Sequence, residues 1–263
     1  MERQQNQAWL RAMPAVFVLI WSTGFIVARY GMPNSPPFTF LLWRYIFSTV
    51  CFVLWVKWAR VPWPQGRAQW GHLAVTGVLM HAGYLGGVWA AVKVGMGAGL
   101  TALIVGLQPV ITAIWLSSRG GHVSRRQWQG LALVSITTGT LYQKRFVQPC
   151  DVRSANAVQL MAAYLVTLPI ALMESEPALW NAEMMWALAW SVVALTLGGS
   201  SLLYILIQRG AAATVTSLMY LVPPTTAVMA WILFNEPITW VTLAGIAVTA
   251  IGVSWVVRPA STR

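Results

Sequence analysis

The sequence predicts an all-α polytopic membrane protein, and three observations support this class. Of its 263 residues, 57% are hydrophobic and only 9% are charged, and the mean hydropathy is +0.63. Apolar runs long enough to cross a bilayer as helices follow one another along the chain. The basic residues behind the net charge of +11 are scattered between these runs, which is typical of membrane charge asymmetry and argues against nucleic-acid binding.

Eight apolar runs have the length of an ordinary membrane-spanning helix, about 18 to 24 residues. The first run follows a charged start, but no small-residue cleavage site comes after it, so we interpret it as a first helix and not as a removed signal. Short connections leave no room for a soluble domain between the runs. We expect the spans at residues 13–30, 40–58, 70–92, 100–117, 155–172, 184–207, 212–234 and 238–257.

The basic connections predict a cytoplasmic N-terminus, because positive residues are retained on the cytoplasmic side. With that orientation the outer connections of the first half carry only Arg29 and Lys93. In the second half Lys144, Arg145 and Arg153 share one connection, and the glutamates occupy the alternate ones. The inner connections of the first half carry Arg3, Arg11, Lys57, Arg60, Arg67, Arg119, Arg125 and Arg126.

The segment 128–146 breaks this pattern. Its apolar part, residues 130–142, would reach only about 20 Å as a helix, whereas a bilayer core needs about 30 Å. Both of its flanks are basic, so both ends favour the cytoplasmic side. A single crossing here would either invert the second half against its charges or require local membrane thinning, and the sequence leaves these alternatives open.

An internal repeat explains the conflict. Shifting the chain by 115 residues aligns Thr23 and Gly24 with Thr138 and Gly139, and the same shift pairs Pro109 with Pro224. The start of segment 128–146 matches the last span, while its end matches the first, so one short helix stands where two are expected. An odd number of spans per repeat produces inverted topology, as in many transporters. About 25 residues are therefore absent at this junction.

Four stretches of the chain form recognisable motifs: LIWSTGFIVARYG at 19–31, PPFTFLLWRY at 36–45, LTALIVGLQPVITAI at 100–114 and the region around Asn235, Glu236 and Pro237. These stretches resemble the EamA-type transporters of the drug/metabolite transporter superfamily. The resemblance implies a ten-helix carrier of the bacterial inner membrane, built from two inverted helical repeats and often exporting amino acids or related metabolites. This chain would have about nine helices, in repeats at 1–129 and 130–263.

Polar residues inside spans are costly and are therefore candidates for the substrate path. Arg44 either reaches the outer headgroups or faces a central cavity, where it would meet an anionic substrate group. Its counterpart at the 115-residue shift, Gln159, is also polar. His81, Tyr84 and Trp89 share roughly one helix face, and the histidine could be an interhelical contact or a proton carrier.

Prolines within spans indicate broken helices, which often mark midplane binding sites. Gln108 precedes Pro109 in the fourth span, and Pro223 and Pro224 lie at the matching place in the other half. Packing kinks are the alternative. The remaining substrate-path candidates are Trp21, Tyr204 and Tyr220. Glu236, beside Asn235 and Pro237, is expected to cap the last span at the outer surface.

Chemistry other than transport finds no support in the sequence. None of the six acidic residues lies in an expected span, and no metal cluster, phosphate loop or activated nucleophile is present, so we expect neither an enzyme nor a cofactor. The predicted function is alternating-access transport of a small molecule across a lipid bilayer. The alternative is a transport-inactive membrane protein with a structural or interaction role. Homo-oligomerisation is left open.

Overall fold

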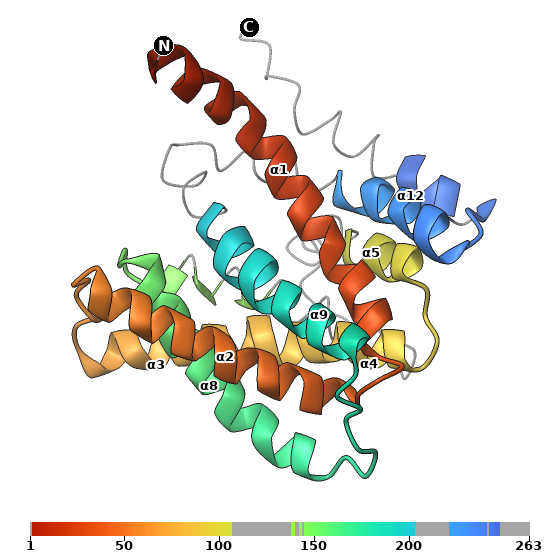
Figure 1. The fold of residues 1–263 in the computed structure, drawn as a ribbon. Helices are drawn as coiled ribbons and strands as arrows, with labels where there is room; N and C mark the ends of the chain where they lie inside the picture. The colour runs from red at the N-terminus through yellow and green to blue at the C-terminus, as the bar shows by residue number, and fades with distance from the viewer. Residues whose placement is uncertain are drawn as a thin grey trace, which may run out of the picture.

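The computed structural model describes residues 2–106, 138–139, 142–143, 145–202, 221–240 and 242–247. This part of the chain is helical with short connections and contains no strand (Figure 1). The expected spans 100–117, 184–207 and 212–234 are described only in part. Most of the span at 238–257 lies outside the described residues.

In the first half, α1 (Glu2–Gly31) is followed by α2 (Pro37–Trp58). The third span is one continuous helix of three segments: α3 (Arg67–Gly77), the π-helical η1 (Val78–Leu85) and α4 (Gly86–Lys93). Helix α5 (Ala98–Gly106) follows after a turn at Gly95, whose φ of 94° favours glycine.

The second half repeats this plan. Helix α8 (Val152–Leu172) begins at Asp151, whose side chain accepts a hydrogen bond from the Arg153 backbone N–H. Helix α9 (Ala182–Trp190) is N-capped by Asn181 and continues into the π-helical η3 (Ser191–Gly199). Helix α12 (Val222–Phe234) ends at Asn235, which adopts the left-handed conformation.

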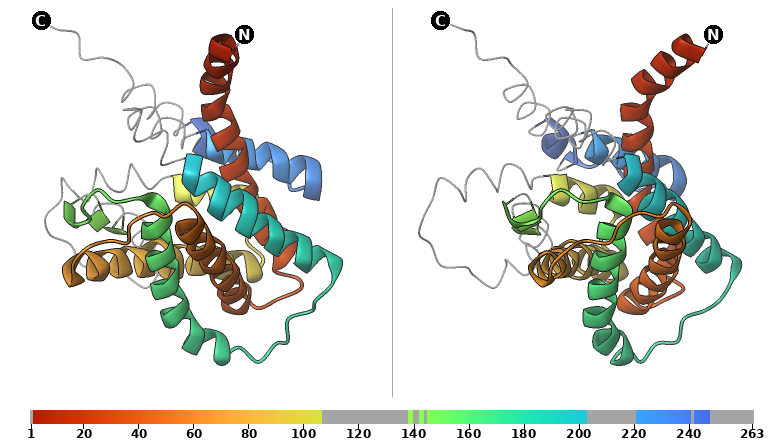
Figure 2. Two further views of the ribbon diagram at one scale, coloured as in Figure 1. Left: turned by 60° about the vertical axis from the view of Figure 1, so that its left-hand side comes forward. Right: turned by 90° about the vertical axis from the view of Figure 1, so that its left-hand side faces the viewer.

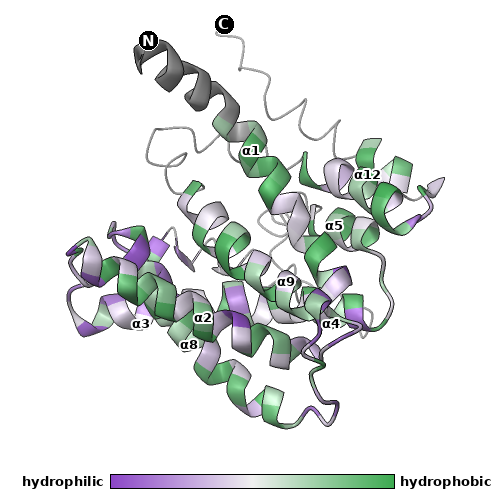
Figure 3. Ribbon diagram, in the orientation of Figure 1, coloured by the Kyte–Doolittle hydropathy of each residue, from purple (hydrophilic) through white to green (hydrophobic). Residues whose placement is uncertain are grey.

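Four described helices are long and apolar enough to cross a membrane: Pro37–Trp58, Arg67–Lys93, Val152–Leu172 and Ala182–Leu202. Ala15–Gly31 and Val222–Phe234 are shorter apolar helices. Figure 3 shows hydrophobic residues along the helices and hydrophilic ones near their ends and connections. Large apolar side chains also face outward, for example Leu165 at 63% exposure, as expected for a surface covered by lipid.

The two halves pair helix with helix. The most extensive packing joins α2 to α8 and α5 to α12, and both pairs lie side by side in Figures 1 and 2. The 115-residue shift maps α2 onto α8, and maps the expected span of α5 onto the one that contains α12. The start of α2 lies beside Glu174, which follows α8, so these two helices are antiparallel. In the same way, the start of α5 lies beside Glu236, which follows α12, so α5 and α12 are also antiparallel.

The end of the irregular segment packs against α3 and η1. Its described residues 138–139, 142–143 and 145–146 are helical. Gly139 faces Met80, Tyr142 OH lies 2.8 Å from His72 Nδ1, and Gln148 N–H donates to Gln69 Oε1. The segment therefore runs antiparallel to the third span. The residues before 138 lie outside the described part.

Basic ends of the two halves lie at the same end of the bundle. The Arg153 guanidinium sits 5.6 Å from the Trp55 ring centre near the end of α2, and Gln148 bonds to Gln69 at the start of α3. We call this the basic end, and the opposite one, which carries Glu174, Glu176 and Glu236, the glutamate end. Of the two alternatives for segment 128–146, inversion of the second half against its charges does not occur in this structure.

Candidate functional site

A cavity of about 90 Å³ lies between the two halves. Five of the predicted substrate-path residues line it: Trp21, Arg44, His81, Tyr84 and Trp89. The second half contributes Leu195, Thr196 and Ser200 from η3 and the residue after it. A larger hollow at Gly66, Arg67 and Trp70 lies on the surface at the basic end and includes none of these residues.

Arg44 points into the protein and does not reach the headgroup region. Its residue exposure is 7%, its Nε donates to Thr196 Oγ1 at 3.1 Å, and its guanidinium carbon lies 5.4 Å from the Trp89 ring centre. The Thr196 hydroxyl donates its own proton to the Ser191 carbonyl at 2.8 Å and so presents a lone pair to Arg44. Of the two positions predicted for this side chain, the structure has the inward one.

In the neighbouring polar contact, the Gln159 side chain lies beside the imidazole of His81. Tyr45 OH donates to the His81 carbonyl at 2.8 Å. The 115-residue shift maps Arg44 onto Gln159 and Thr196 onto His81. The cavity is thus bordered by two polar contacts at repeat-equivalent positions, one of which includes the guanidinium of Arg44.

Both contacts are carried by π-helical segments at equivalent places in the repeat. Residues 78–85 of η1 map onto 193–200, and η3 covers 191–199. A π-helical turn is wider than an α-helical turn and frequently occurs at functional sites. Hydroxyls bond backbone carbonyls in both segments, from Tyr45 to η1 and from Thr196 to η3. These segments have no clear signal in the sequence, because a π-turn shifts helical periodicity by only one residue.

A second repeat-equivalent pair supports the same symmetry. Gly24 of α1 faces Leu195, and Gly139 of the irregular segment faces Met80. Gly24 and Gly139 are 115 residues apart, as are Met80 and Leu195. The end of the irregular segment therefore occupies the position relative to η1 that α1 occupies relative to η3.

The remaining predicted site residues are distributed as follows. Pro223 and Pro224 lie in the first turn of α12, where a missing N–H is tolerated. Ser22 Oγ of α1 donates to the Val222 carbonyl at 3.4 Å, which places this turn beside Trp21. Gln108, Pro109, Tyr204 and Tyr220 lie outside the described residues.

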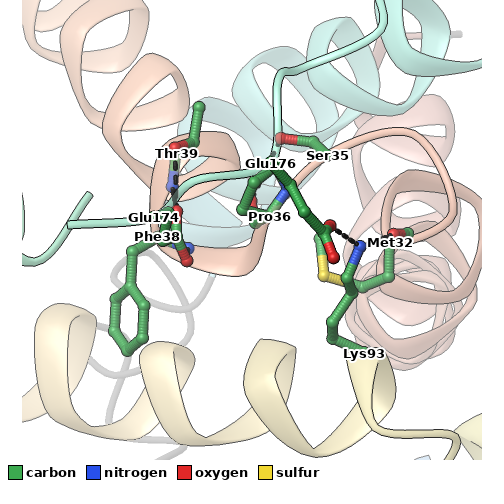
Figure 4. A network of polar contacts seen from close by, with 8 residues as sticks. All are labelled: Met32, Ser35, Pro36, Phe38, Thr39, Lys93, Glu174 and Glu176. Atoms are coloured by element: carbon green, nitrogen blue, oxygen red, sulfur yellow. Dashed lines mark hydrogen bonds and ion pairs between the residues drawn. The ribbon is translucent and has the colours of Figure 1, made fainter. Parts of the chain in front are cut away.

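Carboxylates join the two halves at the glutamate end (Figure 4). Glu174 accepts the Phe38 and Thr39 backbone N–H groups at 3.0 and 2.7 Å, the first free donors of α2 after Pro37. Glu176 pairs with Lys93. We call Glu174, Glu176 and Glu236, with their partners, the glutamate clasp.

The role expected for Glu236 is corrected by its contacts. Its carboxylate accepts the Ala98 and Gly99 backbone N–H groups at 3.0 and 3.3 Å and lies 3.8 Å from Arg29 Nε. It therefore caps α5, in the other half of the chain, and not the following helix. The sequence favoured a cap on the next helix, because that helix directly follows Glu236. In the structure, the antiparallel packing of α5 and α12 brings the N-terminus of α5 closer to Glu236.

Two titratable groups at the basic end have shifted pKa values. Hydrogen bonds from Arg153 hold the pKa of Asp151 below its ordinary value. Burial raises the pKa of the Cys150 thiol, which a hydrogen bond from Gln69 partly offsets. Among the described residues, no group of three His, Cys, Asp or Glu side chains could hold a metal ion.

Comparison with known proteins identifies the repeat. The EamA-like transporter family matches residues 12–141 and again residues 131–258. The chain belongs to this family. The two matches share residues 131–141, so the irregular segment serves as the end of one family unit and the start of the next. An EamA-like chain with this pattern of apolar helices is a multi-pass membrane transporter.

A full-length relative agrees with this assignment. An uncharacterized transporter of Archaeoglobus fulgidus is 21% identical over 276 aligned residues, which cover 91% of this chain and 94% of the relative. The similarity thus extends over both halves and is not confined to one repeat.

Proposed function

We propose that this EamA-like protein carries a small metabolite across the cytoplasmic membrane by alternating access to the cavity between its two inverted repeats. The observation that carries the proposal is the repeat-equivalent pair of polar contacts, Arg44 with Thr196 and Gln159 with His81, on two equivalent π-helical segments. When two inverted repeats meet at a midplane site, the two halves can exchange conformations. The site then opens first to one side of the membrane and next to the other, which is alternating access.

The orientation in the membrane follows from the charged ends. The basic end carries Arg60, Arg67 and Arg153, so the positive-inside rule places it, with the N-terminus, in the cytoplasm. The glutamate clasp then faces outward and has to open for release of the metabolite from the cell. Amino acids and related metabolites are the substrate class implied by the sequence resemblance. The carrier is expected to act without a cofactor and without enzymatic chemistry.

A transport-inactive membrane protein is the second candidate. The observation that favours it is the overlap of the two family matches over residues 131–141, where complete repeats would each have their own helix. In this case the cavity would be a remnant, and the chain would act only as a structural or interaction partner.

Solute release from cells separates the two functions. We would compare cells with wild-type chain, with Ser200→Phe and with Leu165→Phe, at equal amounts in the membrane, and measure small metabolites in the medium. Ser200 lines the cavity, whereas Leu165 faces outward, so only the first substitution should block the path. If the protein is a carrier, wild-type and Leu165→Phe cells release at least one metabolite faster than Ser200→Phe cells and cells without the chain. Identical media for all strains, including one without the chain, would support the inactive protein.

A further inference from the structure

Among the described residues, Arg44 has no acidic side chain as a counterion. It is the one Asp, Glu, Lys or Arg residue among the described residues that line the cavity. The chain has six acidic residues, and the five beyond Glu2 have other partners, namely Arg153 for Asp151, Lys93 for Glu176, Asn34 for Glu183 and helix N-termini for Glu174 and Glu236. Glu2 precedes the cavity residue Trp21 by roughly 29 Å of helix. A buried cation without an opposite charge nearby is strongly unfavourable, and an anionic ligand would supply that charge.

Two residues that line the cavity also carry a buried hydrogen-bond donor without a partner. Among the described residues that line it, the buried side-chain polar atoms without a partner are Arg44 Nη1 and Trp89 Nε1. Trp89 is 2% exposed, and the guanidinium of Arg44 packs against its ring. Neither side chain can accept a hydrogen bond, so both require an acceptor. A carboxylate supplies two acceptor oxygens and the negative charge together.

The rest of the wall is mainly apolar. Phe25, Leu85, Val88 and Leu195 line the cavity, whose volume of about 90 Å³ is well above the roughly 10–15 Å³ that a single water molecule needs. A short hydrocarbon chain fits this wall better than a hydrated inorganic ion. Among the described residues that line the cavity, no carboxylate side chain is available to bind an ammonium group, which disfavours a zwitterion.

We propose that the cavity selects a small organic monoanion, with its carboxylate on Arg44 Nη1 and Trp89 Nε1 and its hydrocarbon part against the apolar wall. The proposal rests on the carrier function above and names its substrate class. It differs from amino-acid transport, because the ligand carries no ammonium group.

Calorimetric titration of the full-length protein in nanodiscs tests this selection with four matched probes. Isovalerate is the anion, isovaleramide is its neutral analogue, valine adds an ammonium group to the same skeleton, and chloride is the inorganic anion. We expect isovalerate to bind at least tenfold more tightly than the other three. An equal or weaker affinity for isovalerate than for any of them, including no binding at all, would overturn the proposal.

Three substitutions then test the donors. Arg44→Gln should weaken isovalerate binding by roughly 10- to 100-fold, because charge-assisted hydrogen bonds are lost, and Arg44→Lys should lie in between. Trp89→Phe keeps the ring but removes the Nε1–H donor, and a loss of roughly 2- to 10-fold is expected even if Arg44→Gln does not fold. Unchanged affinity in the folded variants contradicts the assignment.

These titrations measure binding without a solute gradient, so they distinguish a failure of the anion site from a failure of the carrier function. A protein that binds isovalerate but releases no metabolite from cells would refute the carrier function and leave the anion site in place. A protein that releases metabolites equally well with Gln at position 44 would keep the carrier function and refute the anion site.

Discussion

Gly77 shows at the residue scale how closely the two halves pack. A Cβ atom added there would lie 2.6 Å from Gln159 Cα, and real Cβ atoms do not approach backbone so closely. Gln159 is the residue beside His81, so the glycine sets the distance between α8 and the cavity wall. The sequence contains 21 glycines, and nothing in their spacing distinguishes this one.

Gly77→Ala should therefore destabilise the protein by roughly 1–3 kcal/mol, the usual cost of overpacking. Gly71→Ala is the matched control, because it lies on the exposed side of the same helix with open space around it. There alanine improves helix propensity by up to about 1 kcal/mol. Thermal unfolding in detergent measures both variants, and equal melting temperatures would show that α8 does not contact Gly77 as described.

Cys150 provides a pH-dependent test at the same scale. Burial raises the pKa of its thiol, and since the thiolate is the reactive form, maleimide labelling should be slow at neutral pH and accelerate above pH 9. A Cys51→Ala variant leaves Cys150 as the one cysteine. Labelling is expected in inverted membrane vesicles but not in intact cells, because the basic end is proposed to be cytoplasmic. Rapid labelling of intact cells by an impermeant maleimide would refute that orientation.

At the element scale, the capping of helix N-termini connects the two halves of the chain. Helix α2 begins at Pro37, after Pro36, and neither proline offers a capping side chain. Its first N–H donors are satisfied by Glu174 from the other half. Helix α5 is capped by Glu236 in the same way. Each of these glutamates follows the repeat mate of the helix that it caps, so capping and antiparallel pairing depend on each other.

Glu174→Gln should cost about 1.5–3 kcal/mol of stability, since a charged acceptor of two backbone bonds is replaced by a neutral group that can accept only one of them. Glu176→Gln is the control, because its ion pair with Lys93 is 61% exposed on the glutamate side and should contribute only about 0–1 kcal/mol. Chemical denaturation would compare the two. A loss for Glu176→Gln as large as that for Glu174→Gln would contradict the capping role.

Element positions followed from the sequence far better than element details. Hydropathy placed the spans at 40–58, 70–92 and 155–172 within a few residues of α2, of the third span and of α8. The sequence could predict Arg44, His81 and Trp89 as cavity residues, because polar and aromatic residues are conspicuous inside apolar runs. Thr196 contributes through a hydroxyl, which is common in membrane helices, and only its 115-residue relation to His81 distinguishes it. The trans caps depend on tertiary packing and have no local signal.

At the scale of the whole molecule, the inverted repeat accounts for most of the arrangement. The antiparallel pairs α2 with α8 and α5 with α12, the two π-helical segments and the contacts of Gly24 and Gly139 all obey one 115-residue relation. The irregular segment is the exception, because the two family matches overlap there. Its described end nevertheless packs against η1 as α1 packs against η3, so the shortened junction preserves this half of the symmetry.

Two-sided access to the cavity is the most direct test of the carrier account. Ser200→Cys, in a chain without Cys51 and Cys150, places one thiol in the cavity for an impermeant reagent applied to intact cells or to inverted vesicles. Cysteines at positions 93 and 176, bridged beforehand by a bifunctional thiol reagent, hold the glutamate clasp closed. Alternating access predicts labelling from both sides, with the bridge abolishing labelling from outside and preserving it from inside. Labelling from one side only, or from both sides regardless of the bridge, would contradict it.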